Sequence, residues 1–169
     1  MNKKLSITAI IFLLCCASLA AQTAQNAFAF PYAFSAQDIY GRTVTQAELG
    51  EKEIFFVHYF ATWCPPCVRE MPDLARIAER YGNRVGFIAL LDDFNNRAAA
   101  VRLAQNAGIN FIIVDASHRD FRTLRRMVQS GYVPTTILIG RDGRMIGEQI
   151  IGALGMGYAS HIDKALGGR

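Results

Sequence analysis

The residues of this chain with the clearest chemical potential are two cysteines separated by two prolines. Cys64 and Cys67 lie in the sequence Trp63-Cys64-Pro65-Pro66-Cys67, a few residues after the apolar run Ile54–Phe60. Two cysteines at this spacing can close a small disulfide ring or supply half of a zinc site. A zinc site needs about four ligands, and the further candidates are few: His58, His118 and His161. We therefore favour a redox-active dithiol over a metal centre.

The local pattern places this pair where a strand gives way to a helix. Ile54–Phe60 is continuous and β-favouring, as in a strand that is buried on both faces. Pro65–Tyr81 has a helical pattern, in which proline is tolerated in the first turn and Pro72 is expected to kink the helix. The two cysteines would therefore lie in the first turn of a helix.

The first 20 residues have the pattern of a secretory signal peptide. Lys3 and Lys4 precede an apolar stretch at 5–14, and Ser18-Leu19-Ala20 offers the small residues that signal peptidase needs. The apolar stretch is short compared with the roughly 20 residues of a membrane-spanning helix, so we expect cleavage after Ala20. A retained membrane anchor is the alternative. Either outcome predicts a protein in the periplasm or on the outer face of the cytoplasmic membrane.

Cleavage would change the charge and the cysteine content. It would remove two lysines and no acidic residue, so the formal net charge would fall from +4 to +2. It would also remove Cys15 and Cys16, which are weak candidates for lipid attachment, and leave Cys64 and Cys67 as the remaining cysteines. Exported proteins often carry structural disulfides, but a ring this small constrains little of the unfolded chain. The pair is therefore better explained by function than by stability.

The composition indicates one globular domain. The chain has 169 residues, of which 51% are hydrophobic and 19% are charged, which is enough for a single core. No run of basic residues alternates with aromatic residues as a nucleic-acid surface would require, so we expect no nucleic-acid partner. We predict a linker at residues 21–33 and one domain at residues 34–169.

The rest of the chain alternates between strand and helix patterns. This alternation predicts the α/β class, with a central mixed sheet that is covered by helices on both faces. The expected elements are a β-hairpin at 34–45 that turns at Tyr40-Gly41-Arg42; the strands Val85–Leu91, 111–114 and Thr135–Ile139; the helix Arg97–Ala107, ended by Gly108; a helix capped by Ser117, with Phe121, Leu124 and Val128 on one face; a return strand at 145–151 after the turn Arg141-Asp142-Gly143; and a closing helix with Tyr158, Ile162 and Leu166.

Two segments carry a resemblance to a known family. The sequence at 60–67, followed by Arg69-Glu70 and Pro72, resembles the thioredoxin superfamily and, more narrowly, the exported TlpA/ResA-like thiol–disulfide oxidoreductases. The sequence Gly131-Tyr132-Val133-Pro134-Thr135-Thr136 is similar to the second signature of that family, and the helix and strand at about 95–114 are similar to its insertion. The resemblance implies a thioredoxin-like fold and disulfide exchange with proteins, with no cofactor.

Roles for the helix residues follow from position and resemblance. At a helix N-terminus, free N–H groups and the helix dipole favour the thiolate of Cys64, which is our predicted nucleophile. Cys67, about one helical turn further in, is the predicted resolving cysteine. Glu70 follows Cys67 by three residues and shares its helix face. The resemblance implies that this glutamate moves protons at the dithiol; the alternative is an ordinary exposed carboxylate.

Four other positions carry expectations of their own. Trp63 is expected to border Cys64, with core packing as the alternative. The resemblance implies that Pro134 is cis and faces the dithiol, so that the Val133 backbone can pair with an extended substrate. His58, six positions before Cys64, departs from the family, in which aspartate or asparagine is common. An imidazole there could relay protons, but we favour a core histidine that is bonded to backbone.

One further cluster is cationic. Arg119, Arg122 and Arg126 are expected to share a helical face, which is either solvated or docks an acidic partner.

The function that follows is a disulfide reductase outside the cytoplasm. Its substrates would be proteins with disulfides, apocytochrome c among the candidates, and a thiol-reducing membrane partner would recharge it. One alternative is a peroxiredoxin-like peroxidase, although no proline stands where its Pro-x-x-x-Thr-x-x-Cys pattern requires one before Thr62 and Cys64. Another is a non-enzymatic module that binds peptides or carries metal in the groove beside Pro134.

Overall fold

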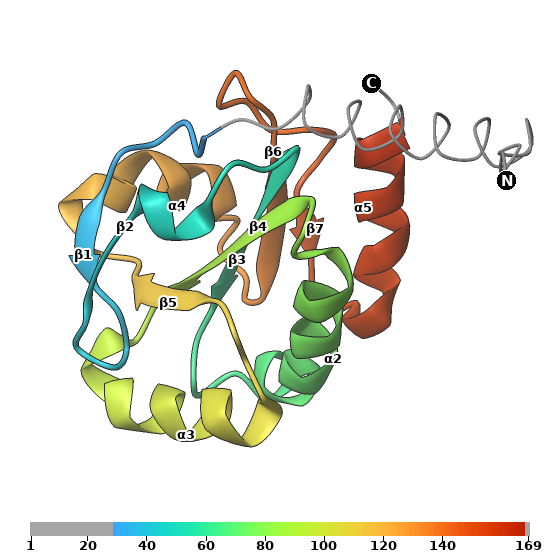
Figure 1. Ribbon diagram of the computed structural model, residues 1–169. Coiled ribbons are helices and arrows are strands. Elements are labelled where there is room, and N and C mark those ends of the chain that lie inside the picture. The colour runs from blue at the N-terminus through green and yellow to red at the C-terminus, as the bar shows by residue number, and fades with distance from the viewer. Residues whose placement is uncertain (1–28, 168–169) are drawn as a thin grey trace, which may run out of the picture.

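The computed structural model describes residues 29–167 (Figure 1). The predicted signal peptide with its cleavage site, and the part of the predicted linker before residue 29, lie outside the described residues. No helix in the described range combines the length and the apolar character that crossing a bilayer requires.

A five-stranded mixed sheet forms the centre of the fold. Its strand order is β5-β4-β3-β6-β7, in which β3, β4 and β5 are parallel, β6 is antiparallel to β3, and β7 is antiparallel to β6. The strands are β3 (Ile54–Phe60), β4 (Val85–Leu91), β5 (Ile112–Asp115), β6 (Thr135–Ile139) and β7 (Ile150–Ile151). A separate antiparallel hairpin consists of β1 (Ser35–Gln37) and β2 (Thr43–Thr45). The predicted fold class is confirmed.

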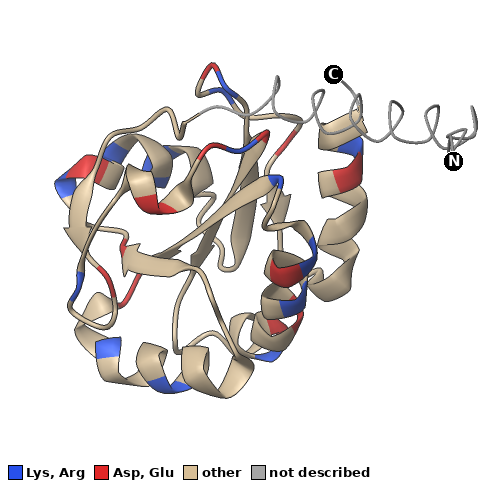
Figure 2. Ribbon diagram, viewed as in Figure 1, with Lys and Arg blue, Asp and Glu red and all other residues tan. Residues whose placement is uncertain are grey.

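Helices cover both faces of this sheet (Figure 1). On one face, α2 (Pro65–Tyr81), α3 (Arg97–Ala107) and α5 (Tyr158–Gly167) share a core with one set of strand side chains. On the other face, α4 (Arg122–Val128) and the β1–β2 hairpin share a second core. Short 3-10 turns join these elements: η1 (Gln46–Leu49), η2 (Phe94–Asn96), η3 (Arg119–Phe121) and η4 (Gly155–Gly157). Figure 2 shows that charged residues of both signs lie mainly on helices and loops, and that the strands are nearly free of them.

The alternation of side chains along β3 decides which residues face α2. Phe56 and Phe60 point into the core beneath α2 and α5, whereas Val57 and Tyr59 point into the core beneath α4. Successive side chains of a strand point to opposite faces. His58 therefore lies on the α2 face, although its strand neighbours are apolar.

The structure corrects two boundaries near the sheet. The return strand expected at 145–151 is shorter: Ile150–Ile151 pair with β6, and Met145 forms an isolated bridge to Ile139. Gly147 between them has a φ of 74°, which is incompatible with an extended strand. The strand expected at 111–114 begins and ends one residue later, at Ile112–Asp115.

The predicted cap of α4 is also wrong. Ser117 donates its hydroxyl hydrogen to Asp115 instead of capping a helix. The side chain of His118 accepts the N–H of Asp120 at the start of η3, and α4 follows that turn. A short polar side chain that finds a nearby acceptor in its own turn leaves the cap position to its neighbour.

Part of the segment expected to be a linker packs on the domain. Phe30 is buried, and its ring centroid lies 4.9 Å from that of Phe55 on β3. Tyr32 donates a hydrogen bond to the carbonyl oxygen of Gly143. Residues 30–32 therefore add to the core beneath α4.

Candidate active site

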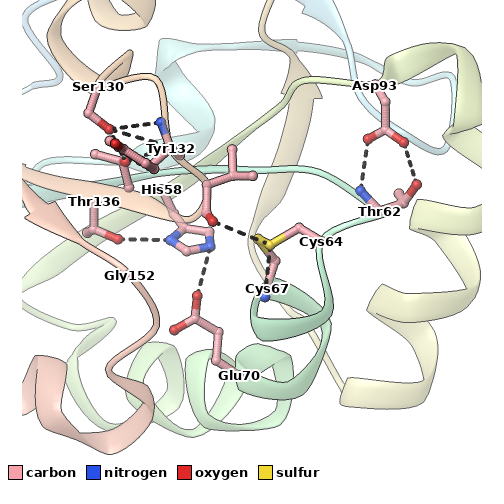
Figure 3. Close-up of a disulfide and its surroundings, with 12 residues drawn as sticks. His58, Thr62, Cys64, Cys67, Glu70, Asp93, Ser130, Tyr132, Thr136 and Gly152 are labelled. Carbon is pink, nitrogen blue, oxygen red and sulfur yellow. Dashed lines mark hydrogen bonds and ion pairs between the residues drawn. A yellow bond between two sulfur atoms is a disulfide. The ribbon is translucent and has the colours of Figure 1, made fainter.

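The two cysteines form a disulfide at the N-terminus of α2 (Figure 3). Cys64 is the N-cap residue, and its Sγ accepts a hydrogen bond of 3.3 Å from the backbone N–H of Cys67. Pro65 and Pro66 follow in the first helical turn, where a missing N–H leaves no intrahelical bond unmade. The exposed fractions are 2% for Cys64 and 0% for Cys67. The helix therefore offers an N–H group and the positive end of its dipole to the sulfur of Cys64.

A carboxylate on a neighbouring loop holds the turn before Cys64. Asp93, which follows β4, accepts hydrogen bonds from both the backbone N–H and the hydroxyl of Thr62 (Figure 3). It also accepts a bond from the side-chain amide of Asn96. Burial acts to raise the pKa of Asp93, but these hydrogen bonds outweigh it and hold the pKa below its ordinary value. Sequence reasoning missed Asp93; the pair Asp92-Asp93 at the end of a predicted strand was the available signal.

The loop before β6 faces the disulfide from the other side. The Val133–Pro134 peptide bond is cis, and the Val133 carbonyl oxygen lies 3.5 Å from the Sγ of Cys64. The hydroxyl of Thr135 donates to the carbonyl of Tyr132 at 2.9 Å and contacts the Ser130 hydroxyl at 2.8 Å. These bonds fix the loop so that a backbone carbonyl is directed at the sulfur.

Two large aromatic side chains next to the disulfide are exposed. Trp63 is 62% exposed and Tyr132 is 67% exposed. The core-packing alternative for Trp63 is therefore wrong. Folding normally buries large aromatic surfaces, so these two side chains depart from the usual pattern.

His58 lies beneath the disulfide in a setting of aromatic rings. It is directly opposite Thr136 in the pairing of β3 with β6, and its Nδ1 lies 2.9 Å from the Thr136 hydroxyl oxygen. Its ring stacks between Phe56 and Phe60, with centroids 6.3 and 5.8 Å away. His58 is a buried core histidine, as predicted. The predicted bond to backbone is wrong, because the partner of Nδ1 is the Thr136 side chain. Burial lowers the pKa of His58 to about 3, because the charged imidazolium loses its hydration.

Glu70 on α2 is buried, so the exposed-carboxylate alternative is wrong. Its exposed fraction is 4%. Burial raises the pKa of Glu70 to about 7, although hydrogen bonds from the backbone N–H groups of Gly155 and Leu154 and from the Tyr158 hydroxyl act in the opposite direction. A carboxyl group with a pKa near neutrality can both give and take a proton at physiological pH.

His58 and Glu70 face each other at the inner side of the disulfide. His58 Nε2 lies 3.6 Å from Glu70 Oε1 (Figure 3), and neither atom has a hydrogen-bond partner in the described part of the protein. The separation would allow an ion pair, but burial favours the neutral form of both residues. At neutral pH the imidazole of this pair is therefore uncharged.

Some predicted residues lie away from this site. Arg119, Arg122 and Arg126 belong to η3 and α4, which cover the opposite face of the sheet. Pro72 lies within α2, which continues through it to Tyr81. Within residues 29–167, no three side chains among His, Cys, Asp and Glu gather in a metal-binding arrangement.

Comparison with known proteins assigns the chain to a family. The AhpC/TSA family matches residues 29–147, which is well over half of the chain. The chain belongs to the AhpC/TSA family. This AhpC/TSA protein is 29% identical to the thiol-disulfide oxidoreductase ResA of Bacillus thuringiensis over 120 residues, which are 70% of this chain and 66% of ResA. The match thus spans just under two thirds of the length of ResA.

Solved structures with the same fold include two bacterial proteins. One is a thiol:disulfide interchange protein of the thioredoxin family from Chlorobium tepidum, with a TM-score of 0.63, 23% identity, and coverage of 83% of this chain and 96% of that one. The other is a DsbF homologue from Corynebacterium diphtheriae, with a TM-score of 0.65, 17% identity, and coverage of 85% and 93%. The fold of this AhpC/TSA protein is thioredoxin-like.

Proposed function

We propose that this protein is a thiol–disulfide oxidoreductase that uses Cys64 as the nucleophile and Cys67 as the resolving cysteine. The observation that carries the proposal is the Cys64–Cys67 disulfide at the N-terminus of α2, facing the carbonyl oxygen of Val133 at 3.5 Å. A thiolate at Cys64 is stabilised by the Cys67 N–H and by the helix dipole. The thiol–disulfide oxidoreductase ResA is similar in sequence and supports this reaction class.

The exchange proceeds in two steps. The Cys64 thiolate of the reduced protein attacks one sulfur of a substrate disulfide, forms a mixed disulfide and expels the other substrate sulfur as a thiolate. Cys67 then loses its proton and attacks the Sγ of Cys64, which releases the second substrate sulfur and forms the Cys64–Cys67 disulfide. Two electrons pass to the substrate. Glu70, three residues beyond Cys67 on α2, accepts the proton of Cys67 as its carboxylate.

The surface around the disulfide fits an extended protein segment. Trp63, next to Cys64, and Tyr132, next to Val133, provide exposed aromatic contact area. The backbone of Val133, next to Pro134, would pair with a substrate strand in the manner of strand addition, and the approach of its carbonyl oxygen to Cys64 supports this role. These contacts are to backbone and apolar groups, so substrates are protein segments that carry a disulfide or cysteines.

We further propose that the protein acts as a reductase outside the cytoplasm. The signal-like sequence at residues 1–20 supports export, followed by cleavage after Ala20 or by retention as an anchor. The reducing direction is supported by the resemblance to the TlpA/ResA-like proteins. A thiol-reducing membrane partner would then recharge the Cys64–Cys67 pair, and apocytochrome c is a candidate substrate.

The reaction class is tested by reduction of insulin with dithiothreitol as the electron donor. We expect the wild-type protein to accelerate the reaction and Cys64→Ser to be inactive. The control is Arg102→Ala, a change at an exposed position of α3, which should retain full activity. Equal rates for the wild type and Cys64→Ser would overturn the proposal.

The direction needs a separate measurement. The reduction potential of the Cys64–Cys67 pair, together with its redox state in cells, distinguishes a reductase from an oxidase. We expect a low potential and a mostly reduced pair. A high potential with a mostly oxidised pair would reverse the direction and leave the reaction class intact.

Two alternatives give different outcomes. A peroxidase would consume peroxide without an added thioredoxin-like partner, yet no proline stands at the required distance before Thr62. A binding or carrier module would keep its affinity for peptides after both Cys64 and Cys67 are changed to alanine, and its activity in the insulin assay would be absent.

A further inference from the structure

Four buried side chains from four elements close a ring beneath the disulfide. His58 on β3 contacts Glu70 on α2 through Nε2, at 3.6 Å, and Thr136 on β6 through Nδ1, at 2.9 Å. The Thr136 hydroxyl donates to the Tyr158 hydroxyl on α5 at 3.3 Å. Tyr158 donates its hydroxyl hydrogen to the carbonyl oxygen of Gly152 at 3.3 Å, and its hydroxyl also interacts with the Glu70 carboxyl. Exposed fractions range from 0% for Thr136 and Tyr158 to 4% for Glu70, so bulk water cannot satisfy these groups.

The number of hydrogens in the ring depends on the charge of Glu70. Four contacts link these groups in series, Glu70–His58, His58–Thr136, Thr136–Tyr158 and Tyr158–Gly152, and each needs one hydrogen. A neutral His58 supplies one N–H, and Thr136 and Tyr158 each supply one O–H. An ionised Glu70 supplies none, so one contact would join two acceptors. A protonated Glu70 supplies the fourth hydrogen and satisfies every contact.

One set of donors satisfies all four contacts and agrees with the donors in the structure. Glu70 donates to Nε2 of His58, the Nδ1–H of His58 donates to Thr136, Thr136 donates to Tyr158, and Tyr158 donates to the carbonyl oxygen of Gly152. The Thr136 hydroxyl is the donor toward Tyr158 in the structure. This set also gives partners to the two atoms that otherwise lack them, Nε2 of His58 and Oε1 of Glu70, once a small side-chain movement shortens their separation.

We propose that His58, Thr136 and Tyr158 are positioning residues that hold Glu70 as the neutral acid in the disulfide form, with the hydrogen of His58 on Nδ1. This inference rests on the proposed function, because it assigns a source to the proton that the dithiol needs. The hydrogen-bonded ring selects both the charge of Glu70 and the tautomer of His58.

The remaining groups around Glu70 are consistent with a stored proton. His58 faces it from β3 and Tyr158 faces it from α5, and both are neutral at physiological pH, because burial lowers the pKa of His58 and raises that of Tyr158. Asp73, on the same helix, adds a negative charge that raises the pKa of Glu70, whereas the N–H groups of Leu154 and Gly155 lower it. No cation faces Glu70 among the groups that shift its pKa.

The stored proton completes the reaction cycle. When one thiolate of a dithiol reductant attacks Cys64, a mixed disulfide forms and Cys67 leaves as a thiolate. The second thiol of the reductant then displaces Cys64, so the reductant becomes a disulfide and two electrons have passed to the pair. Glu70 then transfers its proton to Cys67 and becomes a carboxylate. In the forward reaction, the same carboxylate takes the proton back as Cys67 attacks the mixed disulfide, so the ring is complete again in the oxidised protein.

The test is nuclear magnetic resonance of the oxidised protein, with nitrogen-15 in histidine and carbon-13 in the glutamate carboxyl groups. Glu70→Gln assigns the Glu70 signal. We expect a neutral His58 with its hydrogen on Nδ1, and a Glu70 carboxyl that is protonated in slightly acidic solution. A His58 hydrogen on Nε2, or a Glu70 carboxyl that is ionised in slightly acidic solution, would overturn the proposal. Both results come from the wild-type protein, so they do not depend on whether a variant folds.

Two substitutions at one position separate the hydroxyl from the packing. Thr136→Val keeps the shape and removes the hydroxyl, so the hydrogen of His58 should move to Nε2 and stabilise the Glu70 carboxylate, and the Glu70 titration midpoint should move to lower pH. Thr136→Ser keeps the hydroxyl and should keep the wild-type midpoint. An unchanged midpoint in Thr136→Val contradicts the ring. The insulin assay separates this failure from a failure of the proposed function. If the midpoint is unchanged in Thr136→Val but Cys64→Ser is inactive with insulin, the ring is wrong and the proposed function stands.

Discussion

The two sides of the Cys64–Cys67 disulfide differ in almost every physical property. On the outer side, Trp63 and Tyr132 are aromatic and mostly exposed. On the inner side, His58 and Glu70 are polar and almost fully buried. This is the reverse of the usual partition of apolar and polar side chains between core and surface. The exposed aromatic side chains and the buried polar side chains occur at the same site. Each arrangement lowers stability, and a functional role accounts for its presence.

The difference assigns separate tasks to the two sides. An exposed apolar surface gains free energy when a substrate covers it. A buried carboxyl group gains a pKa near neutrality, which an exposed one cannot have. We therefore expect changes on the outer side to alter substrate affinity, and changes on the inner side to alter pH dependence.

The largest effect is expected at the sulfur that joins the two sides. Cys67→Ser should stop the reaction at the mixed disulfide, because no second thiolate can release the substrate. Incubation with an oxidised protein substrate should then yield a covalent complex that dithiothreitol removes, which mass spectrometry detects. Cys64→Ser should give no complex. A complex of equal yield in Cys64→Ser would show that Cys64 is not the nucleophile.

The next largest effect is expected on the inner side. Glu70→Gln should slow the reduction of the Cys64–Cys67 disulfide by about 10²-fold at acidic to neutral pH, the lower end of what a positioned acid or base contributes. Because the acid form of Glu70 delivers the proton, the advantage of the wild type should fall as pH rises through about 7. Stopped-flow reduction by dithiothreitol gives both rates, and their ratio cancels the ionisation of the reductant. A ratio that does not change with pH would contradict this role.

The inner side also predicts a distinctive dependence of stability on pH. The pKa of Glu70 rises on folding from its ordinary value to about 7, so its contribution is fully present at low pH and is lost as pH rises toward 7. The pKa of His58 falls to about 3, so its contribution is present above the ordinary histidine pKa and is lost as pH falls. Between about pH 5 and 6.5, the two contributions have opposite slopes and should nearly cancel.

Glu70→Gln exposes the contribution of His58. The free energy of unfolding of this variant should rise with pH over that range by up to about 1.4 kcal/mol per pH unit, while that of the wild type stays nearly flat. Urea unfolding at several pH values measures both. The control Arg102→Ala should follow the wild type, and parallel curves for Glu70→Gln and the wild type would mean that the two slopes do not oppose each other.

The smallest effect is expected on the outer side. Trp63→Ala should raise the KM for a protein substrate by about tenfold or less, which corresponds to about 1.4 kcal/mol, because it removes exposed contact area. The free energy of unfolding should change by less than about 0.5 kcal/mol, and the pH profile should be that of the wild type. A changed pH profile with an unchanged KM would place Trp63 with the inner side.

Local patterns made the framework of the site predictable from sequence. The continuous apolar run Ile54–Phe60 and the helix Pro65–Tyr81 have the predicted bounds. Gly131-Tyr132-Val133-Pro134 was identified from a motif. Two short elements were less predictable. The positive φ of Gly147 interrupts the expected return strand, and the hydrogen bond from Ser117 to Asp115 competes with the expected helix cap.

Long-range contacts were not predictable in this way. Asp93 holds Thr62 across 31 positions of the sequence, and His58 meets Thr136 across 78. No periodicity reports such a pairing, because the register of β3 with β6 depends on how the whole sheet assembles. The burial of Glu70 likewise depends on η4 and α5, which follow it by more than 80 positions.

The amino-acid sequence by itself determined which groups can react. A strand, a turn and a helix in immediate succession place two cysteines at a helix N-terminus, and this requires only local backbone preferences. The tertiary structure decided what those groups have for neighbours. It brought β3, β6, α2 and α5 together around one carboxyl group. The pKa of that group depends on burial and on the sum of its neighbours, and a buried environment exists only after the chain has folded.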